Sequence, residues 1–235
     1  MGTILQRSEC VSETMMGNRR VASFLFVLPI KLGIAVQLAT VLQSKQIKLN
    51  IRILKTVQTS TGRVLQLEGG ASFLEAFMKA YCDEIKKFKA PGMQCAVVLV
   101  VDNDSEGEKI CAAIRKLTKK SVTKTGPYVH IAGNLYMVLT PLKAEATKST
   151  IEDCFAEEIK NLKIGGKAFN RDNNADSSLY FGKHILSQHV RENAAKIDFA
   201  GFAVLLDSIT AAIEAHQNKQ AVVAAQGANV AVSTP

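Results

Sequence analysis

Two aspartates two positions apart, Asp102 and Asp104, directly follow an apolar run over residues 95–101. A continuous apolar run of this length is typical of a buried strand in an α/β sheet. Gly107 comes next and indicates a turn into a helix. Carboxylates at the carboxyl end of such a strand lie where α/β proteins bind their ligands. Two carboxylates this close repel each other unless a cation lies between them, so the pair predicts a site for a hard divalent cation bound through oxygen.

A further carboxylate, Glu68, has the same kind of setting. Residues 64–67 have the composition of a strand, and Glu68 ends that strand before a pair of glycines and a predicted helix. Two strand-to-helix turns therefore each supply carboxylates, which strengthens the prediction of chemistry at this edge of the sheet.

This order, strand–Glu–Gly–helix followed by strand–Asp-x-Asp–helix, resembles the Toprim domain of topoisomerases, bacterial primases and OLD-type nucleases. The resemblance implies an α/β fold with a mostly parallel sheet flanked by helices. It also implies that Glu68, Asp102 and Asp104 bind Mg²⁺ (or Mn²⁺) during the hydrolysis or transfer of nucleic-acid phosphodiesters.

Two other cation-binding or phosphate-binding folds have similar acidic runs and are excluded. An EF-hand loop would need a bidentate glutamate at its twelfth position, which is Ala113 here, and the run follows a strand rather than a helix. A receiver domain would need an aspartate at the end of a later strand, where this chain has Thr140.

A wider resemblance links this chain to the C-terminal, Toprim-like extension of some retron reverse transcriptases. It implies the effector part of a phage-defence system, with a reverse transcriptase and its structured RNA as further partners. No Tyr-x-Asp-Asp polymerase motif is present, so we expect either a fragment of a larger polymerase or a separate effector. The matching segments are residues 98–109, 130–141, 151–155, 165–170, 180–185 and 198–207.

Three more residues are candidates for the same chemistry. Glu152 and Asp153 follow Ser149 and Thr150 at a predicted helix start. Acidic residues there either complement the helix dipole or add a metal carboxylate, and the sequence leaves both interpretations open. Lys183 is either an ordinary surface lysine or a catalytic group that stabilises charge on a phosphate in the transition state.

Composition favours an anionic partner. The 235 residues have a formal net charge of +8 and a pI near 9.3, and 47% are hydrophobic, enough for a sizeable core. We therefore expect DNA or RNA as the substrate. The basic stretch over residues 115–124 is better explained as a solvated helix end than as a phosphate contact. The five scattered cysteines form no C-x-x-C pair, which indicates reduced thiols in a cytoplasmic protein.

We expect a Toprim-like domain over residues 61–217, preceded by an apolar N-terminal extension of unclear fold over 1–60 and followed by a disordered tail over 218–235. The apolar run over 21–42 is interpreted as a buried helix pair or a piece of a larger fold. A membrane-spanning helix is the less favoured alternative, because Pro29 and Lys31 interrupt the run, so no stable membrane association is expected. Alternation over residues 47–53 predicts a connecting or edge strand.

The spacing of Ser105 and Glu108 predicts a capping box at the start of the helix that follows the two aspartates. The functional hypothesis is a metal-dependent nuclease in which Glu68, Asp102 and Asp104 hold the cation, Glu152 or Asp153 completes the site, and Lys183 assists. The alternative is a non-catalytic nucleic-acid-binding or regulatory module of a reverse transcriptase.

Overall fold

The computed structural model describes residues 23–27, 51–54, 71–87, 95–124, 126–172 and 175–231. Glu68 and the strand predicted over 64–67 lie outside these residues. The described part contains a five-stranded sheet with the strand order β2-β1-β3-β5-β4. Its strands are β1 (Ser23–Val27), β2 (Ile51–Leu54), β3 (Val97–Val101), β4 (Val129–Ala132) and β5 (Leu135–Leu139).

Strands β2, β1, β3 and β5 pair in parallel, and only β4 runs antiparallel to its neighbour β5. The predicted α/β class is therefore confirmed. β2 lies at the edge, as the alternation over 47–53 predicts. The helix pair predicted over 21–42 is wrong for Ser23–Val27, which pairs with β3 inside the sheet. That short run is rich in Phe and Val, and such residues favour a strand.

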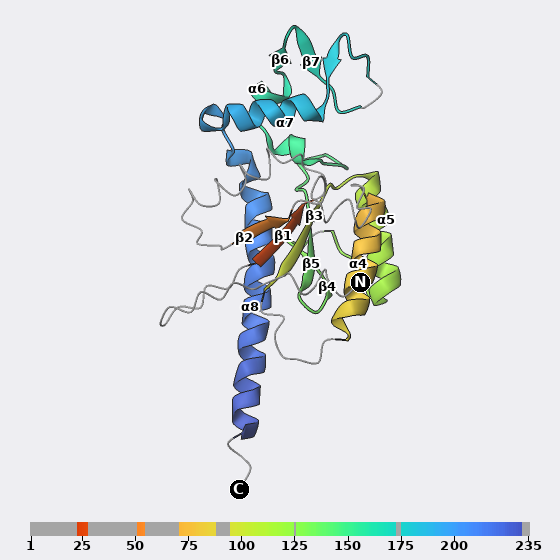
Figure 1. Cartoon of the computed structure of the whole chain (residues 1–235), viewed down its shortest axis with the longest axis vertical. Coiled ribbons are helices and arrows are strands. Elements are labelled where there is room, and N and C mark those ends of the chain that lie inside the picture. The colour runs from red at the N-terminus through yellow and green to blue at the C-terminus, as the bar shows by residue number, and fades with distance from the viewer. Residues whose placement is uncertain are drawn as a thin grey trace.

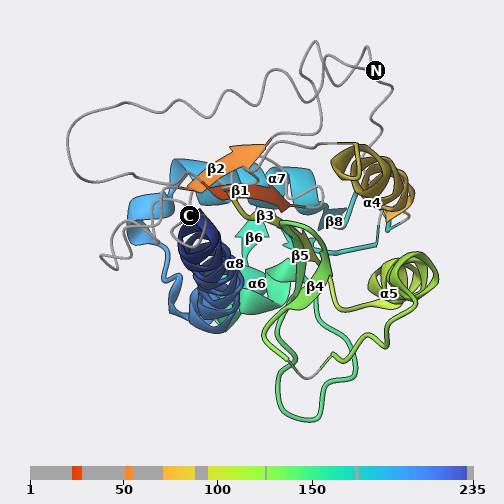
Figure 2. The same cartoon turned by 90° about the horizontal axis from the view of Figure 1, so that it is seen from below.

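Helices cover both faces of this sheet (Figures 1 and 2). α4 (Ala71–Ile85) and α5 (Ser105–Thr118) lie on one face, and α8 (Ala203–Ala231) lies on the other. The side chains of β3 alternate between two cores. One core contains Leu99 with residues of α4 and α5, and the other contains Val98 with residues of α8. Burial on both faces explains why this strand is apolar throughout, with no alternation in its sequence.

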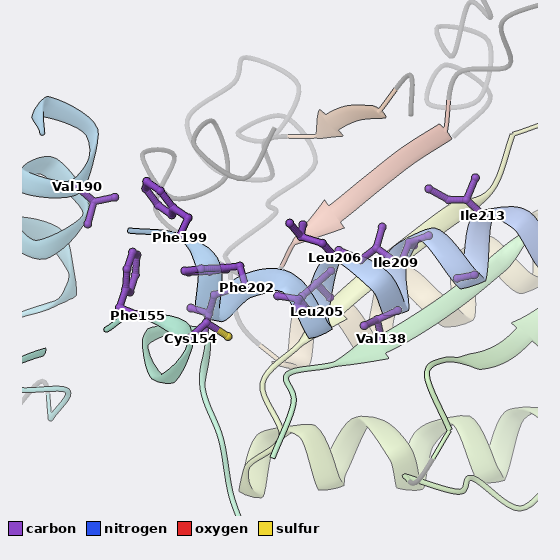
Figure 3. Packing of buried hydrophobic residues seen from close by; sticks show 14 of the residues in the cluster. Val138, Cys154, Phe155, Val190, Phe199, Phe202, Leu205, Leu206, Ile209 and Ile213 are labelled. Carbon is purple, nitrogen blue, oxygen red and sulfur yellow. The ribbon is translucent and has the colours of Figure 1, made fainter. Parts of the chain in front are cut away.

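The core on the α8 side ends in a cluster of aromatic rings (Figure 3). The ring of Phe155 packs edge-on against Phe202 with a centroid distance of 4.9 Å, and both rings contact Phe199. A Cβ on Gly201 would lie 2.2 Å from the carbonyl oxygen of Cys154, so the chain before Phe202 approaches that backbone as only glycine allows. This packing fixes the short helix η1 (Ile151–Cys154) against the start of α8.

A smaller layer gathers at the end of the molecule from which α8 begins (Figure 1). It contains a three-stranded sheet with the order β6-β7-β8. Its elements are α6 (Glu157–Lys160), β6 (Lys163–Ile164), β7 (Lys167–Phe169), β8 (Tyr180–Phe181), α7 (Lys183–Glu192), η2 (Ala194–Lys196) and η3 (Ala200–Phe202).

α8 continues beyond the sheet to Ala231, where the sequence predicts a disordered tail from residue 218 (Figure 1). The prediction of disorder therefore differs from the structure. Val222 and Val223 in this extension are more than half exposed. Five residues between 218 and 231 are Ala, the residue of highest helix propensity, which favours a helix there. No helix of the described residues is both long and apolar enough to cross a membrane.

Candidate functional site

Asp102 leaves the end of β3 and is held from the opposite side by η1. The amide of Ile151 donates a hydrogen bond of 2.9 Å to Oδ1 of Asp102. Burial, and after it the nearby charge of Glu152, raise the pKa of Asp102 to about 6, although the Ile151 hydrogen bond and the charge of Lys183 act to lower it. The fold therefore holds Asp102 where its negative charge is costly without an added cation.

Glu152 is the most unusual group in this region. It is only 3% exposed, and its Oε1 lies 3.1 Å from Nζ of Lys183. Its Oε2 is buried and has no hydrogen-bond partner among the described residues. A buried carboxylate oxygen left without a donor costs free energy, so such a group in a folded protein calls for an additional ligand.

Lys183 supplies positive charge to both carboxylates. It is the first residue of α7, directly after Gly182, which precedes the helix in an extended conformation. Its ion pair with Glu152 joins α7 to η1, and its charge lowers the pKa of Asp102. The Lys183 side chain is 36% exposed, so solvent or an anionic ligand can reach it. One lysine thus faces two carboxylates.

Asp104 caps a helix and also lies near enough to Asp102 for its charge to act there. Its Oδ1 accepts hydrogen bonds from the amides of Glu106 and Gly107, at 2.9 and 3.0 Å, and so caps the N-terminus of α5. The N-cap is therefore Asp104 and not Ser105, because the side chain of an extended Asp104 reaches the free amides, and the predicted capping box of Ser105 and Glu108 is wrong. Its charge still raises the pKa of Asp102.

Asp153 has hydrogen-bond partners of its own. Arg171 donates to both of its carboxylate oxygens, at 2.5 and 3.1 Å, and the amide of Thr150 donates to Oδ2 at 2.8 Å. Burial opposes ionisation of Asp153, but these hydrogen bonds outweigh it and hold its pKa below the ordinary value. Of the two acidic residues that the sequence could not separate, Glu152 is the one placed beside Asp102.

A buried polar clamp sets the spacing between β3 and η1. Thr140, at the end of β5, accepts a hydrogen bond from the amide of Asn103 at 2.9 Å, and its Oγ1 lies 2.8 Å from Oγ of Ser149. The amide of Ser149 donates in turn to the carbonyl of Asn103 at 2.9 Å. All three residues are at most 3% exposed. Since Asn103 follows Asp102 and Ser149 precedes Glu152, the clamp positions both carboxylates.

Sequence reasoning missed this clamp. Thr140 stands out in the sequence only as the end of a strand, and Ser149 only as a hydroxyl before a helix. Their partners are 9 and 37 positions away. No rule of sequence spacing connects these residues, so their contacts can be recognised only once the order of the strands is known.

Gly107 allows α5 to approach the end of β3. A Cβ at this position would lie 2.1 Å from the carbonyl oxygen of Asp102. Gly107 lies inside the first turn of α5 and does not have a positive φ. Its role is therefore to let the helix pack closely against the strand. It therefore fixes how Asp104 and the helix N-terminus sit beside Asp102.

The structure thus brings Asp102, Asp104, Glu152 and Lys183 to one edge of the sheet, while Glu68 lies outside the described residues. No group of three His, Cys, Asp or Glu side chains within the described residues is arranged to hold a metal ion. No protein-family model matches the chain. No solved structure matches it at a significant level. The function has to be inferred from these residues themselves.

Proposed function

We propose that the chain is a metal-dependent phosphodiesterase of the Toprim type that cleaves DNA or RNA. One observation supports this most strongly. Buried Glu152 has one oxygen paired with Lys183 and the other without a partner, beside an Asp102 that is costly to ionise. Two carboxylates and one lysine thus lie near one another, an arrangement that a divalent cation would complete.

The donor set suits Mg²⁺ or Mn²⁺. Asp102 and Glu152 offer carboxylate oxygens, which these hard cations prefer, and no described cysteine or histidine is part of the group. Asp104 and Glu68 are the further candidate ligands, and Asp153 is the weaker one because Arg171 occupies both its oxygens. When bound, the cation would activate water and stabilise charge at phosphorus.

The protein's own residues would orient this chemistry. The Ile151 amide fixes Oδ1 of Asp102, and the Asn103–Thr140–Ser149 clamp fixes η1. Lys183 holds Glu152 in place and, being partly exposed, offers positive charge to a phosphate oxygen. Charge placed in advance where the transition state becomes more negative lowers the barrier to cleavage.

The placement of the site supports a Toprim-like assignment. Asp102 lies at the carboxyl end of a strand with parallel neighbours on both sides, where open α/β sheets bind ligands. The four described cysteines are buried and free, which suits a cytoplasmic protein. On this proposal the chain is the effector part of a retron system, and a reverse transcriptase with its structured RNA is its partner.

Cleavage assays on a mixed panel test the proposal: single- and double-stranded DNA, transfer RNA and structured RNA, each with Mg²⁺, Mn²⁺ or EDTA. The comparison protein is Asp102→Asn/Asp104→Asn, which keeps the Ile151 hydrogen bond and the helix cap through amide oxygens. We expect metal-dependent cutting that the variant loses. Binding without cutting by the parent protein would favour the regulatory module instead.

A further inference from the structure

A basic strip follows the candidate site along the chain, defined by Arg115, Lys116, Lys119, Lys120 and Lys124. It runs from the last turns of α5 into the loop before β4, with no acidic residue between its first and last members. All but Lys124 are exposed. Of these residues only Lys124 forms a salt bridge within the described part of the chain. Cations concentrated in this way and left without carboxylate partners favour a polyanion.

A pocket opens beside one member of the strip, Lys120. Its volume is about 150 Å³, and it lies between the end of α5, the loop after it and β4. Lys120, Ser121, Thr123 and His130 contribute to its lining. In a small concave site, a lysine and two hydroxyl residues can donate hydrogen bonds to the oxygens of a phosphate group. The chemistry of the pocket therefore matches the charge of the strip.

Lys124 connects the strip to the candidate site. Its Nζ forms an ion pair with Glu108 on the first turn of α5 and lies 3.4 Å from Oδ1 of Asn103. Asn103 is the residue after Asp102, so the strip ends beside the proposed cation ligands. Arg115 follows Glu108 by seven helical steps, a rise of about 10 Å, which is the length of about three base-pair steps along one strand.

We propose that the basic strip binds the phosphate backbone of the nucleic-acid substrate, that the pocket holds one backbone phosphate, and that the strand leads from there to Asp102. This inference rests on the proposed function for what happens at Asp102, but binding to the strip is measured separately. It replaces the interpretation of residues 115–124 as only a solvated helix end, because a solvated helix end requires neither the pocket nor the link to Asn103.

The test compares two triple variants in an Asp102→Asn background, which separates binding from cleavage. The strip variant is Arg115→Gln/Lys116→Gln/Lys120→Gln. The control, Arg191→Gln/Lys196→Gln/Lys219→Gln, removes the same charge from exposed residues of α7, η2 and α8. Dissociation constants are measured over a range of salt concentrations with short fluorescent duplexes and single strands of DNA and RNA. Thermal melting checks that both variants are folded.

We expect the strip variant to bind at least about tenfold more weakly. The slope of log affinity against log salt concentration should become less steep by about 2, because each lost phosphate contact removes about 0.7 to 0.9 from that slope. The control should change affinity less than about twofold. Equal weakening of binding in both variants, or no weakening in either, would overturn the proposal that the strip binds the phosphate backbone. If the parent protein cleaves nothing, the proposed function fails while the binding comparison still decides the strip.

Discussion

The amide of Ile151 donates a hydrogen bond to the carboxylate of Asp102 across 49 positions of sequence. This contact joins the end of the sheet's central strand to the short helix that holds Glu152. It brings two carboxylates into one site, where the charge of Lys183 acts on both. The balance of these charges and the packing that maintains it determine how the site should respond to substitution, pH and metal ions.

Asp102→Asn should stabilise the metal-free protein at pH 8. Because burial raises the folded-state pKa of Asp102 to about 6 from 3.8, the folded protein holds this proton more tightly than the unfolded chain. Stability therefore falls as pH rises between these values, and the whole cost is present above them. We expect a gain of about 1 to 3 kcal/mol at pH 8 that disappears near pH 4, measured by urea unfolding in EDTA. Asp83→Asn, at an exposed site on α4, should change stability little at either pH.

Binding of Mg²⁺ should depend on the same proton. Below pH 6 the folded protein holds Asp102 protonated, and that proton must leave before the oxygen can act as a ligand. We expect the rise in melting temperature caused by MgCl₂ to be larger at pH 7.5 than at pH 5.5. In Asp102→Asn the effect should be small at both. A shift of equal size at the two pH values would argue against Asp102 as a ligand.

Glu152→Gln and Asp153→Asn should behave differently, although the residues are adjacent. Glu152 has a buried oxygen without a described partner, whereas both oxygens of Asp153 accept hydrogen bonds from Arg171. We expect Glu152→Gln to reduce single-turnover cleavage at least about a hundredfold and Asp153→Asn to keep most of it. The reverse order would mean that the metal site uses Asp153.

Thr140→Val should loosen the site without touching a charged group. The substitution keeps the volume but removes the hydroxyl that accepts from Asn103 and bonds with Ser149, leaving buried polar groups unsatisfied. We expect a loss of about 1 to 3 kcal/mol in the free energy of unfolding. Thr210→Val on α8 removes a hydroxyl that bonds only within its helix, to the carbonyl of Leu206, and should cost less.

Gly107→Ala should separate α5 from the end of β3. The new methyl group would lie 2.1 Å from the carbonyl oxygen of Asp102, so backbone must move. We expect a destabilisation of about 1 to 3 kcal/mol and loss of cleavage, checked by unfolding and by the nuclease assay. Gly182→Ala provides the matched control, because a Cβ there meets nothing within 4 Å. If both glycine variants behaved alike, the close approach would not matter.

Sequence alone predicted the local features of the site. The apolar run before Asp102 indicates a buried strand, and in the structure both faces of that strand, β3, are covered. The sequence leaves open whether Lys183, and which of Glu152 and Asp153, lies near Asp102. In the structure Lys183 pairs with Glu152, and the charges of both act on Asp102. The choice between Glu152 and Asp153 needed the position of Arg171, which is 18 residues from Asp153 in sequence.

What the sequence could not provide was the long-range pairing. Ser23–Val27 lies far from β3 in sequence and inside an apolar stretch, where a buried helix and a buried strand look alike. The continuation of α8 past His216 contains five Ala residues, whose helix propensity hydrophobic periodicity does not register. The Thr140–Ser149 contact appears only after β5 is placed next to β3.

The most direct test of the central claim is Mn²⁺ binding, measured by electron paramagnetic resonance on the parent protein, Glu152→Gln and Asp153→Asn. We expect the parent to bind Mn²⁺, Glu152→Gln to bind it at least about tenfold more weakly, and Asp153→Asn to match the parent. Equal affinity of the parent and Glu152→Gln, or no binding by the parent, would contradict a cation site at Asp102 and Glu152.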